Sequence, residues 1–378
     1  MLVVIVNRNG LPHVYDCMKS LLNTHYRAFD VVLFDNGSMD GSDVGVRDIC
    51  RQDGRVLLLR SRRAMPLTRA ANLAIRTAGR HAKYVALLDS DVVVRPDWLR
   101  KLIGVIERSP SIGSCQSLLL RADAPDIVDG TGDFVDVFGH AISRDSGRKL
   151  AEINLPGIKR DILSARSAAM LVRNDLFERV GGLDESFGYG FEDVDLGWRI
   201  RLAGFNICLV VDSVVHHRVG GTARRLTKSY LIYQGTKNRL QMLLKNYEIS
   251  SVMKYVPLRI GLDLIGATLL FLARRPENCL AVFRGLGWNL VNVRRVLTRR
   301  QLVQNRIRTV RDSVLIGTHI DRRLIIHPIL AWKLLTLQDD RNHKERLVGK
   351  RGSMLRTQVF QPGEFSEPVC KRSQQAMS

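Results

Sequence analysis

Two carboxylates spaced one residue apart follow an apolar run in the first quarter of the chain. Residues 84–88 are apolar or aromatic throughout, and Asp89 and Asp91 come directly after them. Such a run suits a strand covered on both faces, and open α/β folds bind ligands at the carboxyl edge of such strands. Carboxylate oxygens are good ligands for Mg²⁺ or Mn²⁺, with phosphate oxygens filling further positions. The pair therefore indicates a metal site, with a polar turn before a helix as the alternative.

A second apolar run, residues 31–34, also ends in a polar loop, which contains Asp35, Asn36 and Ser38. Asp and Gly residues in this loop are compatible with an ordinary turn. A carboxylate at the end of a strand can also accept hydrogen bonds from the imide N–H of a pyrimidine base or from ribose hydroxyls. Residues 68–72 open a predicted helix and would place donors near a phosphate group. Both segments are therefore candidates for nucleotide binding.

Three acids, Glu192, Asp193 and Asp195, stand at the start of another predicted helix. The positive end of the helix dipole is one explanation for acids at this position. The preceding residues 186–191 are rich in glycine and aromatic side chains, a composition better suited to a loop that closes over a ligand. Further along, His216 and His217 end an apolar run. A histidine pair is usually ordinary surface or core, but neutral imidazole is also a good manganese ligand.

The elements that would position these residues alternate between strand-like and helical patterns. The predicted strands are Leu2 to Val6, Val31 to Phe34, Val56 to Leu59 and Tyr84 to Leu88. The predicted helices are Val14 to Leu22, Thr68 to Ala78 and Pro96 to Arg108. This alternation predicts an α/β fold, a three-layer sandwich with a mainly parallel sheet. Between residue 109 and about residue 205 the pattern is less regular.

The net charge of +21 is concentrated in the C-terminal part of the chain. Residues 1–223 carry 29 Lys and Arg against 27 Asp and Glu, whereas residues 224–351 carry 26 against 8. Such a block indicates close contact with an anionic partner, either a membrane face or nucleic acid. Few aromatic residues accompany the basic charge and no zinc or RNP-type signature is present, so we expect no nucleic-acid partner.

The C-terminal pattern is helical as well as basic. The run from Val256 to Ala273 is the one candidate for a membrane span, but Arg259 and Asp263 interrupt it and only Leu264 to Ala273 is unbroken. A span needs about twenty apolar residues. We therefore expect either a helix in the interfacial plane, with arginines meeting anionic headgroups, or a buried helix of a helical subdomain.

The cysteines and the N-terminus bear on the compartment. The six cysteines show no Cys-x-x-Cys spacing, so neither a zinc knuckle nor a disulfide framework is indicated. Reduced thiols in a cytosol are the simplest explanation. A strand-like run starts at Leu2 and leaves no room for a secretion signal. The expected location is cytoplasmic, peripheral at the inner face of the cell membrane.

Taken in order, these clusters resemble the family 2 glycosyltransferases of GT-A fold, especially the rhamnosyltransferase-like branch that builds bacterial surface polysaccharides. The resemblance covers roughly residues 1–250. It rests on Val3-Val4-Ile5-Val6-Asn7-Arg8-Asn9-Gly10, Asp35-Asn36-Gly37-Ser38, Asp40-Gly41-Ser42, Asp89-Ser90-Asp91, Gly181-Gly182-Leu183-Asp184-Glu185, Glu192-Asp193-Val194-Asp195 and His216-His217. Two departures concern donor recognition. Arg8 stands where the family usually has Tyr or another residue, and residues 62–67 replace a glycine-rich Asn-x-Gly-Phe segment.

The resemblance implies a role for each cluster. Asp91 would bind Mg²⁺ or Mn²⁺ at the diphosphate, with Asp89 and one of His216 and His217 completing the site. Asp193 would be the catalytic base, with Glu192 beside it. The residues implied in binding the nucleotide sugar are Asn7, Asn9, Asp35, Asn36, Ser38, Asn72 and Asp89. The residues implied on the acceptor side are Asp195 and Trp198.

The implied protein is an inverting, metal-dependent glycosyltransferase that acts on a nucleotide-diphosphate sugar and on a saccharide or lipid-linked acceptor. Residues 1–223 would form the catalytic domain, residues 224–338 a basic, helical, membrane-associating region, and residues 339–378 a polar, disordered tail. The alternative is a basic nucleic-acid- or membrane-binding protein with a degenerate, inactive transferase domain.

Overall fold

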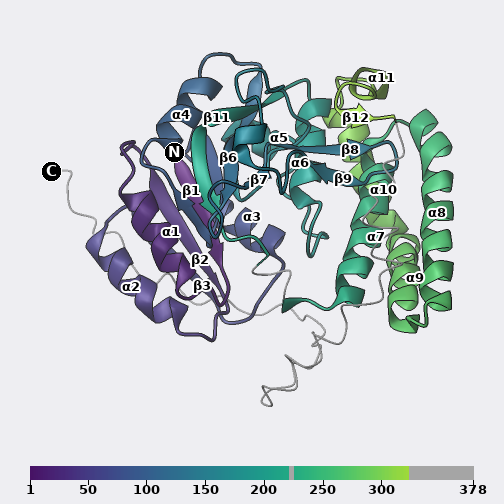
Figure 1. The fold of residues 1–378 in the computed structure, drawn as a ribbon, viewed down its shortest axis with the longest axis horizontal. Helices are drawn as coiled ribbons and strands as arrows, with labels where there is room; N and C mark the ends of the chain where they lie inside the picture. The colour runs from purple at the N-terminus through teal and green to yellow at the C-terminus, as the bar shows by residue number, and fades with distance from the viewer. Residues whose placement is uncertain (221–224, 323–378) are drawn as a thin grey trace.

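The computed structural model describes residues 1–220 and 225–322, and it shows a central β-sheet between helices, followed by a group of C-terminal helices (Figure 1). The strands of the central sheet are β1 (Leu2–Asn7), β2 (Asp30–Asn36), β3 (Val56–Ser61), β4 (Tyr84–Asp89), β5 (Val92–Val94), β6 (Ile112–Arg121), β7 (Val128–Gly130), β10 (Ala169–Arg173) and β11 (Asn206–His217). Their order is β3-β2-β1-β4-β10-β6-β11-β5, and β7 pairs with β6.

Helices cover both faces of this sheet. The helices are α1 (His13–Leu22), α2 (Ser42–Gln52), α3 (Leu67–Ala78), α4 (Trp98–Ile106), α5 (Asn174–Arg179) and α6 (Glu192–Leu202). Successive side chains of a strand point to opposite faces. Val3 and Ile5 of β1 therefore pack in one hydrophobic cluster with α1, α2 and α4, whereas Leu2 and Val4 pack in another with α3, α5 and α6. The predicted three-layer α/β sandwich is confirmed.

The sheet is mixed in direction. The strands β3, β2, β1 and β4 run parallel, as do β6 and β11. The strand β10 runs antiparallel to both β4 and β6, and β5 runs antiparallel to β11. The parallel part corresponds to the four strands expected from the sequence. The antiparallel strands come after residue 90, where the apolar pattern is shorter or less regular.

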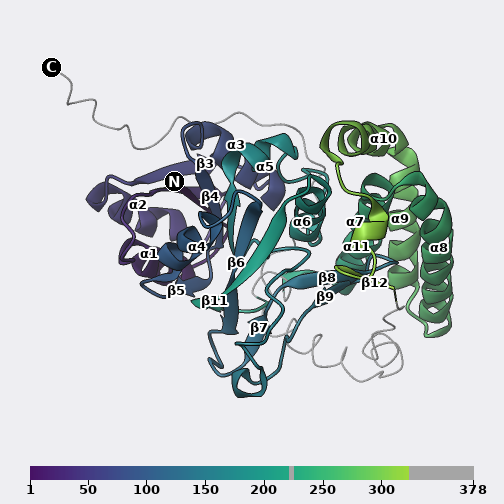
Figure 2. The same cartoon turned by 90° about the horizontal axis from the view of Figure 1, so that it is seen from above.

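A smaller sheet lies beside the central one (Figure 2). It consists of β8 (Asp133–Asp136), β9 (Ala141–Ser143) and β12 (Ile320–Asp321), in the order β12-β8-β9, and the short 3-10 helix η1 (Leu150–Glu152) follows β9. Because β12 comes after the C-terminal helices, this sheet ties the end of the described chain back to the N-terminal domain.

The C-terminal helices are α7 (Lys228–Asn246), α8 (Ile249–Leu272), α9 (Pro276–Val291), α10 (Val293–Leu302) with the π-helical turn η3 (Val303–Ile307), and α11 (Asp312–Leu315). Figures 1 and 2 place α7 toward the sheet and α8 at the outer side. Leu240, Met242 and Leu243 of α7 belong to the same hydrophobic cluster as α3 and α6, so this region shares a core with the N-terminal domain. Residues 323–378, with the expected tail, lie outside the described residues.

Candidate active site

The carboxyl ends of three neighbouring strands place polar residues side by side. In the parallel register, Asn7 of β1 stands opposite Asp35 of β2, and Val6 stands opposite Asp89 of β4. Parallel strands end at the same edge of a sheet, which is where open α/β folds bind ligands. Asn7, Asp35 and Asp89, which are far apart in the sequence, therefore share one edge.

The two acids after β4 and a histidine from β11 form a cluster of possible metal ligands. One ligand atom each from Asp89, Asp91 and His217 lies within 4.8 Å of the others. The Nε2 atom of His217 is 3.5 Å from Oδ1 of Asp91 and 3.9 Å from Oδ2 of Asp89. The antiparallel pairing of β11 with β5 sets this geometry, because it places His217 opposite Val92.

The neighbouring His216 is not part of the cluster. Adjacent residues of a strand point to opposite faces, so only one of the two histidines can face the acids. Burial and the positive charge of Arg95 lower the pKa of His216. The sequence left both histidines as candidates, and the structure brings only His217 to the acid pair.

Asp129 on β7 orients the His217 ring. Its Oδ2 atom lies 2.9 Å from Nδ1 of His217, which leaves Nε2 facing the acid pair. Arg166 in turn donates a hydrogen bond to Asp129 at 3.0 Å and pairs with Asp133 at 3.1 Å. Burial alone would lower the pKa of His217, but hydrogen bonds to Asp129 and Asp91 raise it to about 10. Three carboxylates, those of Asp89, Asp91 and Asp129, lie around this one imidazole and give the site a negative electrostatic potential.

This centre fits a divalent cation. Two carboxylates and one imidazole nitrogen are a donor set that suits Mn²⁺ or Mg²⁺. A histidine ligand typically donates its second ring N–H to a carboxylate, which is the position that Asp129 occupies. Burial and the charge of Asp91 raise the pKa of Asp89 to about 6, and a bound cation would relieve this repulsion.

Glu192 and Asp193, the candidate bases, begin α6. Phe191, directly before them, has a φ of 72°, a backbone conformation that residues other than glycine rarely adopt. Both acids are half-buried. Burial and the nearby Asp133 raise the pKa of Asp193 to about 6, and burial and Asp193 raise that of Glu192 to about 8. Near neutral pH, Asp193 is therefore the more readily ionised of the two.

Arg166 links the base to the metal cluster. Its guanidinium pairs with Asp129, the partner of His217, and its charge also opposes the rise in the pKa of Asp193. The charge of Asp89 in turn contributes to the raised pKa of Glu192. The candidate metal ligands and the candidate base therefore lie in one electrostatic neighbourhood.

The polar residues after β1 and β2 hold two loops together. Asn9 accepts a hydrogen bond from the backbone N–H of Met39 at 2.7 Å, and the Ser38 hydroxyl accepts one from the backbone N–H of Asn9 at 3.0 Å. Asn7 donates to the hydroxyl of Ser42 at 2.9 Å. Asp35 is 1% exposed, and the Arg60 guanidinium lies 3.6 Å from it. The loops are thus fixed relative to the sheet edge.

Asn36 and Asn72 were expected to bind the donor, but in the structure their side chains bind the protein backbone instead. The amide of Asn36 makes two hydrogen bonds with the backbone of Met65, at 2.8 and 2.9 Å. The amide of Asn72 makes two with the backbone of Leu183, at 2.8 and 3.0 Å, and one with Glu185. Both side chains are buried, and their hydrogen-bonding groups are used to fasten loops. We therefore assign them a supporting role.

The prediction that Asp195 and Trp198 face the acceptor is wrong. Both side chains are 0% exposed. Asp195 pairs with Arg199 at 2.8 Å and with Lys245 at 2.9 Å, and Trp198 packs edge-on against Tyr247 at 4.9 Å between ring centroids. Along an α-helix, two residues correspond to a turn of about 200°, so Asp195 points away from the direction of Asp193.

A polar stripe on α7 supports the loop before the candidate base. Lys237 donates to the carbonyl of Ser186, and Asn238 donates to the carbonyls of Tyr189 and Gly190 at 3.0 and 2.8 Å. Further along the same helix, Gln241 donates to the Ser186 hydroxyl and Lys245 to Asp184 at 2.6 Å. The C-terminal helices therefore position residues 184–190, which lead into Glu192 and Asp193.

Sequence reasoning missed Asp129, Asp133 and Arg166. All three lie between residues 109 and 205, where the apolar pattern is irregular. The one local signal is the pair of acids that flanks Gly130-Thr131-Gly132, which on its own reads as a turn. The proximity of Asp129 to His217 depends on the pairing of β7 with β6, a contact that no local pattern reveals.

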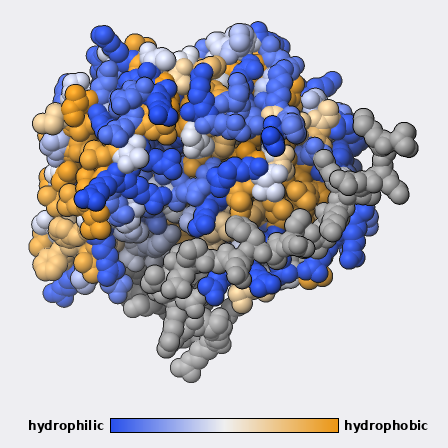
Figure 3. All heavy atoms as spheres, turned by 180° about the vertical axis from the view of Figure 1, so that it is seen from behind, coloured by the Kyte–Doolittle hydropathy of each residue, from blue (hydrophilic) through white to orange (hydrophobic). Residues whose placement is uncertain are grey.

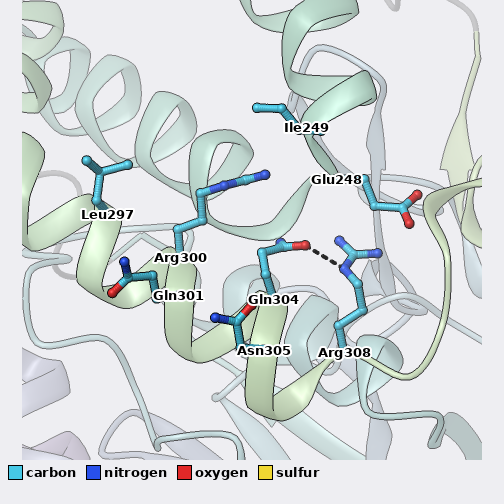
Figure 4. Close-up of a pocket in the computed structure, with 8 residues that line it drawn as sticks. All are labelled: Glu248, Ile249, Leu297, Arg300, Gln301, Gln304, Asn305 and Arg308. Carbon is cyan, nitrogen blue, oxygen red and sulfur yellow. Dashed lines mark hydrogen bonds between the residues drawn. The ribbon is translucent and has the colours of Figure 1, made fainter.

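A pocket of ≈ 510 Å³ lies elsewhere, in the C-terminal helices (Figure 4). It is lined by Glu248, Ile249, Leu297, Arg300, Gln301, Gln304, Asn305 and Arg308. None of these residues belongs to the metal cluster or to the candidate base. Arg308 donates to Gln304 across the pocket wall at 2.8 Å, and Arg300 donates to the carbonyls of Leu244 and Tyr247.

Comparison with known proteins shows that part of this chain is similar to a known family. Residues 2–145 match the family model described as glycosyl transferase family 2. The O-antigen biosynthesis protein RfbC of Myxococcus xanthus is 28% identical over 204 residues, which are 52% of this chain and 16% of that protein. The N-acetylglucosaminyl-diphospho-decaprenol L-rhamnosyltransferase of Mycobacterium tuberculosis is 26% identical over 242 residues, which are 59% of this chain and 77% of that protein.

Among solved structures, a similar one is that of GalNAc-T7 with UDP, GalNAc and Mn²⁺. It is 18% identical, with a TM-score of 0.49, and the match covers 68% of this chain and 54% of that one.

Proposed function

From the match of residues 2–145 to the glycosyl transferase family 2 model, we propose that the protein transfers a sugar from a nucleotide-diphosphate donor to a saccharide or lipid-linked acceptor. The observation that carries the proposal is the cluster of Asp89, Asp91 and His217 within 4.8 Å, at the sheet edge that also holds Asn7 and Asp35. A nucleotide diphosphate needs both features, a cation for its phosphates and polar groups for its nucleoside.

Different residues would act on the two sides of the donor, one group at the diphosphate and another at the acceptor hydroxyl. Asp89, Asp91 and His217 would hold Mg²⁺ or Mn²⁺, and Asp129 keeps the ring of His217 in the required orientation. When bound, the cation supplies positive charge that offsets the negative charge of the departing diphosphate. Asp35, at the neighbouring strand end, would accept hydrogen bonds from the base or the ribose.

Asp193 would take the proton from the acceptor hydroxyl. Its Oδ1 atom accepts a hydrogen bond from the backbone N–H of Val194 at 2.8 Å, which leaves Oδ2 for the incoming hydroxyl. A base that faces the acceptor from the side opposite to the leaving diphosphate leads to inversion at the anomeric carbon. We therefore propose an inverting transfer, which NMR of the product's anomeric proton tests.

Other features support a proposal for the acceptor and for the location. The rhamnosyltransferase from Mycobacterium tuberculosis carries a lipid-linked acceptor in its name, which supports a lipid-linked acceptor here as well. The five cysteines within the described residues form no disulfide, and this suits a reducing compartment. We place the enzyme on the cytoplasmic side of the cell membrane.

The test is nucleotide release by the purified full chain, with Mn²⁺ and a panel of UDP-, GDP- and dTDP-sugars. We expect one donor class to release nucleotide, and Asp91→Asn and Asp193→Asn to lose most of this turnover. Asp212→Asn is the matched control, because Asp212 is an exposed acid on β11, the strand of His217. Full turnover in both site variants would contradict the assignment, and no release from any donor would favour the inactive-domain alternative.

A further inference from the structure

Large apolar side chains are exposed along the length of α8. They are Ile249, Met253, Leu258, Leu264, Ile265, Leu269, Phe271 and Leu272. Phe271 is 65% exposed and Leu272 is 70% exposed. By length and composition, α8 is the one helix among the described residues that could cross a membrane, yet only 28% of its apolar stretch is buried inside the protein. Its outer side is therefore apolar without being covered.

The exposed apolar surface continues onto the next two helices. Its members there are Leu280, Phe283, Leu290, Val291, Val293 and Leu297. Together with the α8 residues they form what we call the apolar face. In Figure 3, hydrophobic residues gather along the left edge of the molecule, the side that carries α8 and α9. Monomeric soluble proteins rarely expose a large contiguous apolar patch unless it contacts a membrane or another protein.

Two charged residues within α8, Arg259 and Asp263, are buried and bind the rest of the protein. Arg259 pairs with Asp263, and its Nη1 atom lies 2.8 Å from Nε2 of His140 in the loop between β8 and β9. Arg239 of α7 approaches Asp263 at 3.7 Å. Arg259 and Asp263 interrupt the apolar run in the sequence, but they do not interrupt the apolar face because both are buried. Because its inner side is fastened to the protein, α8 can offer lipid only its outer side.

Positive charge borders the apolar face. Residues 249–300 contain nine Lys and Arg against two Asp and Glu. One of the two acids, Asp263, is buried, and the exposed cations include Lys254, Arg274, Arg284 and Arg294. A second copy of the chain docked on this face would bring like charges together. Anionic headgroups would instead meet opposite charge.

We propose that the apolar face of α8, α9 and α10 docks onto a bilayer that contains anionic lipid, with α8 in the interfacial plane. This proposal does not depend on the transferase chemistry, because it rests on residues outside the candidate active site. The pocket described above adjoins the face, since Ile249 and Leu297 belong to both, and Arg300 and three amide side chains also line it (Figure 4). An interfacial helix buries one apolar side and keeps its polar side out of the lipid, as observed for α8.

Vesicle co-sedimentation of the full chain tests the proposal. We expect the protein to bind vesicles of phosphatidylcholine mixed with phosphatidylglycerol, and to bind phosphatidylcholine vesicles more weakly. The variant with Ile265→Asp and Phe271→Asp should bind the mixed vesicles at least about tenfold more weakly, because two apolar contacts are replaced by charges of the same sign as the lipid. Both positions are exposed, so the fold should persist, and an unchanged circular dichroism spectrum checks this.

A matched control uses apolar residues exposed on the opposite part of the molecule. Met39→Asp with Val44→Asp makes the same charge change in the N-terminal domain and should leave vesicle binding unchanged. Arg274→Gln with Arg284→Gln should weaken binding to the mixed vesicles and leave the weaker binding to phosphatidylcholine unaffected.

Three outcomes would overturn the proposal. One is wild-type protein that binds neither kind of vesicle. Another is a wild-type dimer in light scattering that becomes monomeric in the Ile265→Asp, Phe271→Asp variant, since the face would then join two copies. The third is vesicle-bound protein that resists an alkaline carbonate wash, because this would indicate a spanning helix instead of an interfacial one.

Discussion

The Nδ1 atom of His217 lies 2.9 Å from the Oδ2 atom of Asp129, and this contact fixes which nitrogen of the ring faces Asp89 and Asp91. Asp129 is itself held by Arg166 at 3.0 Å. The orientation of one candidate metal ligand therefore depends on a residue from β7 and on a half-buried arginine that precedes β10. The site extends beyond the residues that would touch the cation.

We predict that Asp129→Asn weakens the metal site without removing it. The asparagine keeps the size of the side chain, but it loses the charge that stabilises the N–H form at Nδ1 of His217. Loss of such a partner typically costs about 10- to 100-fold in metal affinity or activity. Turnover should therefore need more Mn²⁺ to reach half its maximum, and saturating Mn²⁺ should restore most of it. A variant that no Mn²⁺ concentration rescues would show that Asp129 does not act through the metal.

Asp193→Asn should remove the chemical step and leave donor binding intact. A positioned general base typically contributes about 10² to 10⁴ in rate, so kcat should fall by this order. The donor's nucleotide, measured by isothermal titration with Mn²⁺, should bind with unchanged affinity because Asp193 does not belong to the metal cluster. Glu192→Gln is the comparison variant. A larger loss of kcat in Glu192→Gln than in Asp193→Asn would transfer the role of base to Glu192.

The pH dependence of kcat/KM should report the ionisation of Asp193. Burial and the charge of Asp133 raise the pKa of Asp193 to about 6. Since the base acts in its ionised form, kcat/KM should be low below about pH 6 and should rise as the pH increases through this value. Asp133→Asn removes a negative neighbour and should move this acid limb to lower pH. An acid limb that stays in place, or moves to higher pH, would contradict the assignment.

Most of the fold could be predicted from the sequence because its signals are local. The apolar runs that predicted β1, β2 and β4 end within two residues of the observed strands, and the confirmed three-layer α/β sandwich follows from their alternation with helices. The positions of Asp35, Asp89 and Asp91 directly after apolar runs also predicted them as candidate site residues. The helix α2 escaped notice because it has few apolar residues, and its N-cap is Gly41 with a φ of 80°.

The rest of the site depends on long-range pairing. The choice between His216 and His217 requires the register of β11 against β5, since alternate residues face opposite sides. Asp195 looked functional because it stands close to Asp193 in the sequence, but the helical rotation turns it into the core. There it pairs with Arg199 and with Lys245, a residue 50 positions further along the chain. Burial of this kind is not visible in a short motif.

Lys245 couples the C-terminal helices to the loop that leads into the candidate base. Its ammonium group lies 2.6 Å from Asp184 and 2.9 Å from Asp195, and all three side chains are buried. Lys245→Met would leave Asp184 without its cation, and removing one partner of a buried ion pair typically costs about 3–5 kcal/mol of unfolding free energy. Lys19→Met, at an exposed position of α1, is the matched control and should change stability little.

The same ion pair predicts the acid sensitivity of the fold. Burial favours the neutral form of Asp184, but the charge of Lys245 dominates and holds the pKa of the carboxyl well below its usual range. A depressed pKa in the folded state contributes stability at neutral pH, and this stability is lost as the pH falls below the unfolded value of about 4. Urea unfolding at a series of pH values should show this loss in the wild type and a smaller one in Lys245→Met. Equal pH dependence in both proteins would mean that Lys245 is not the source of the Asp184 shift.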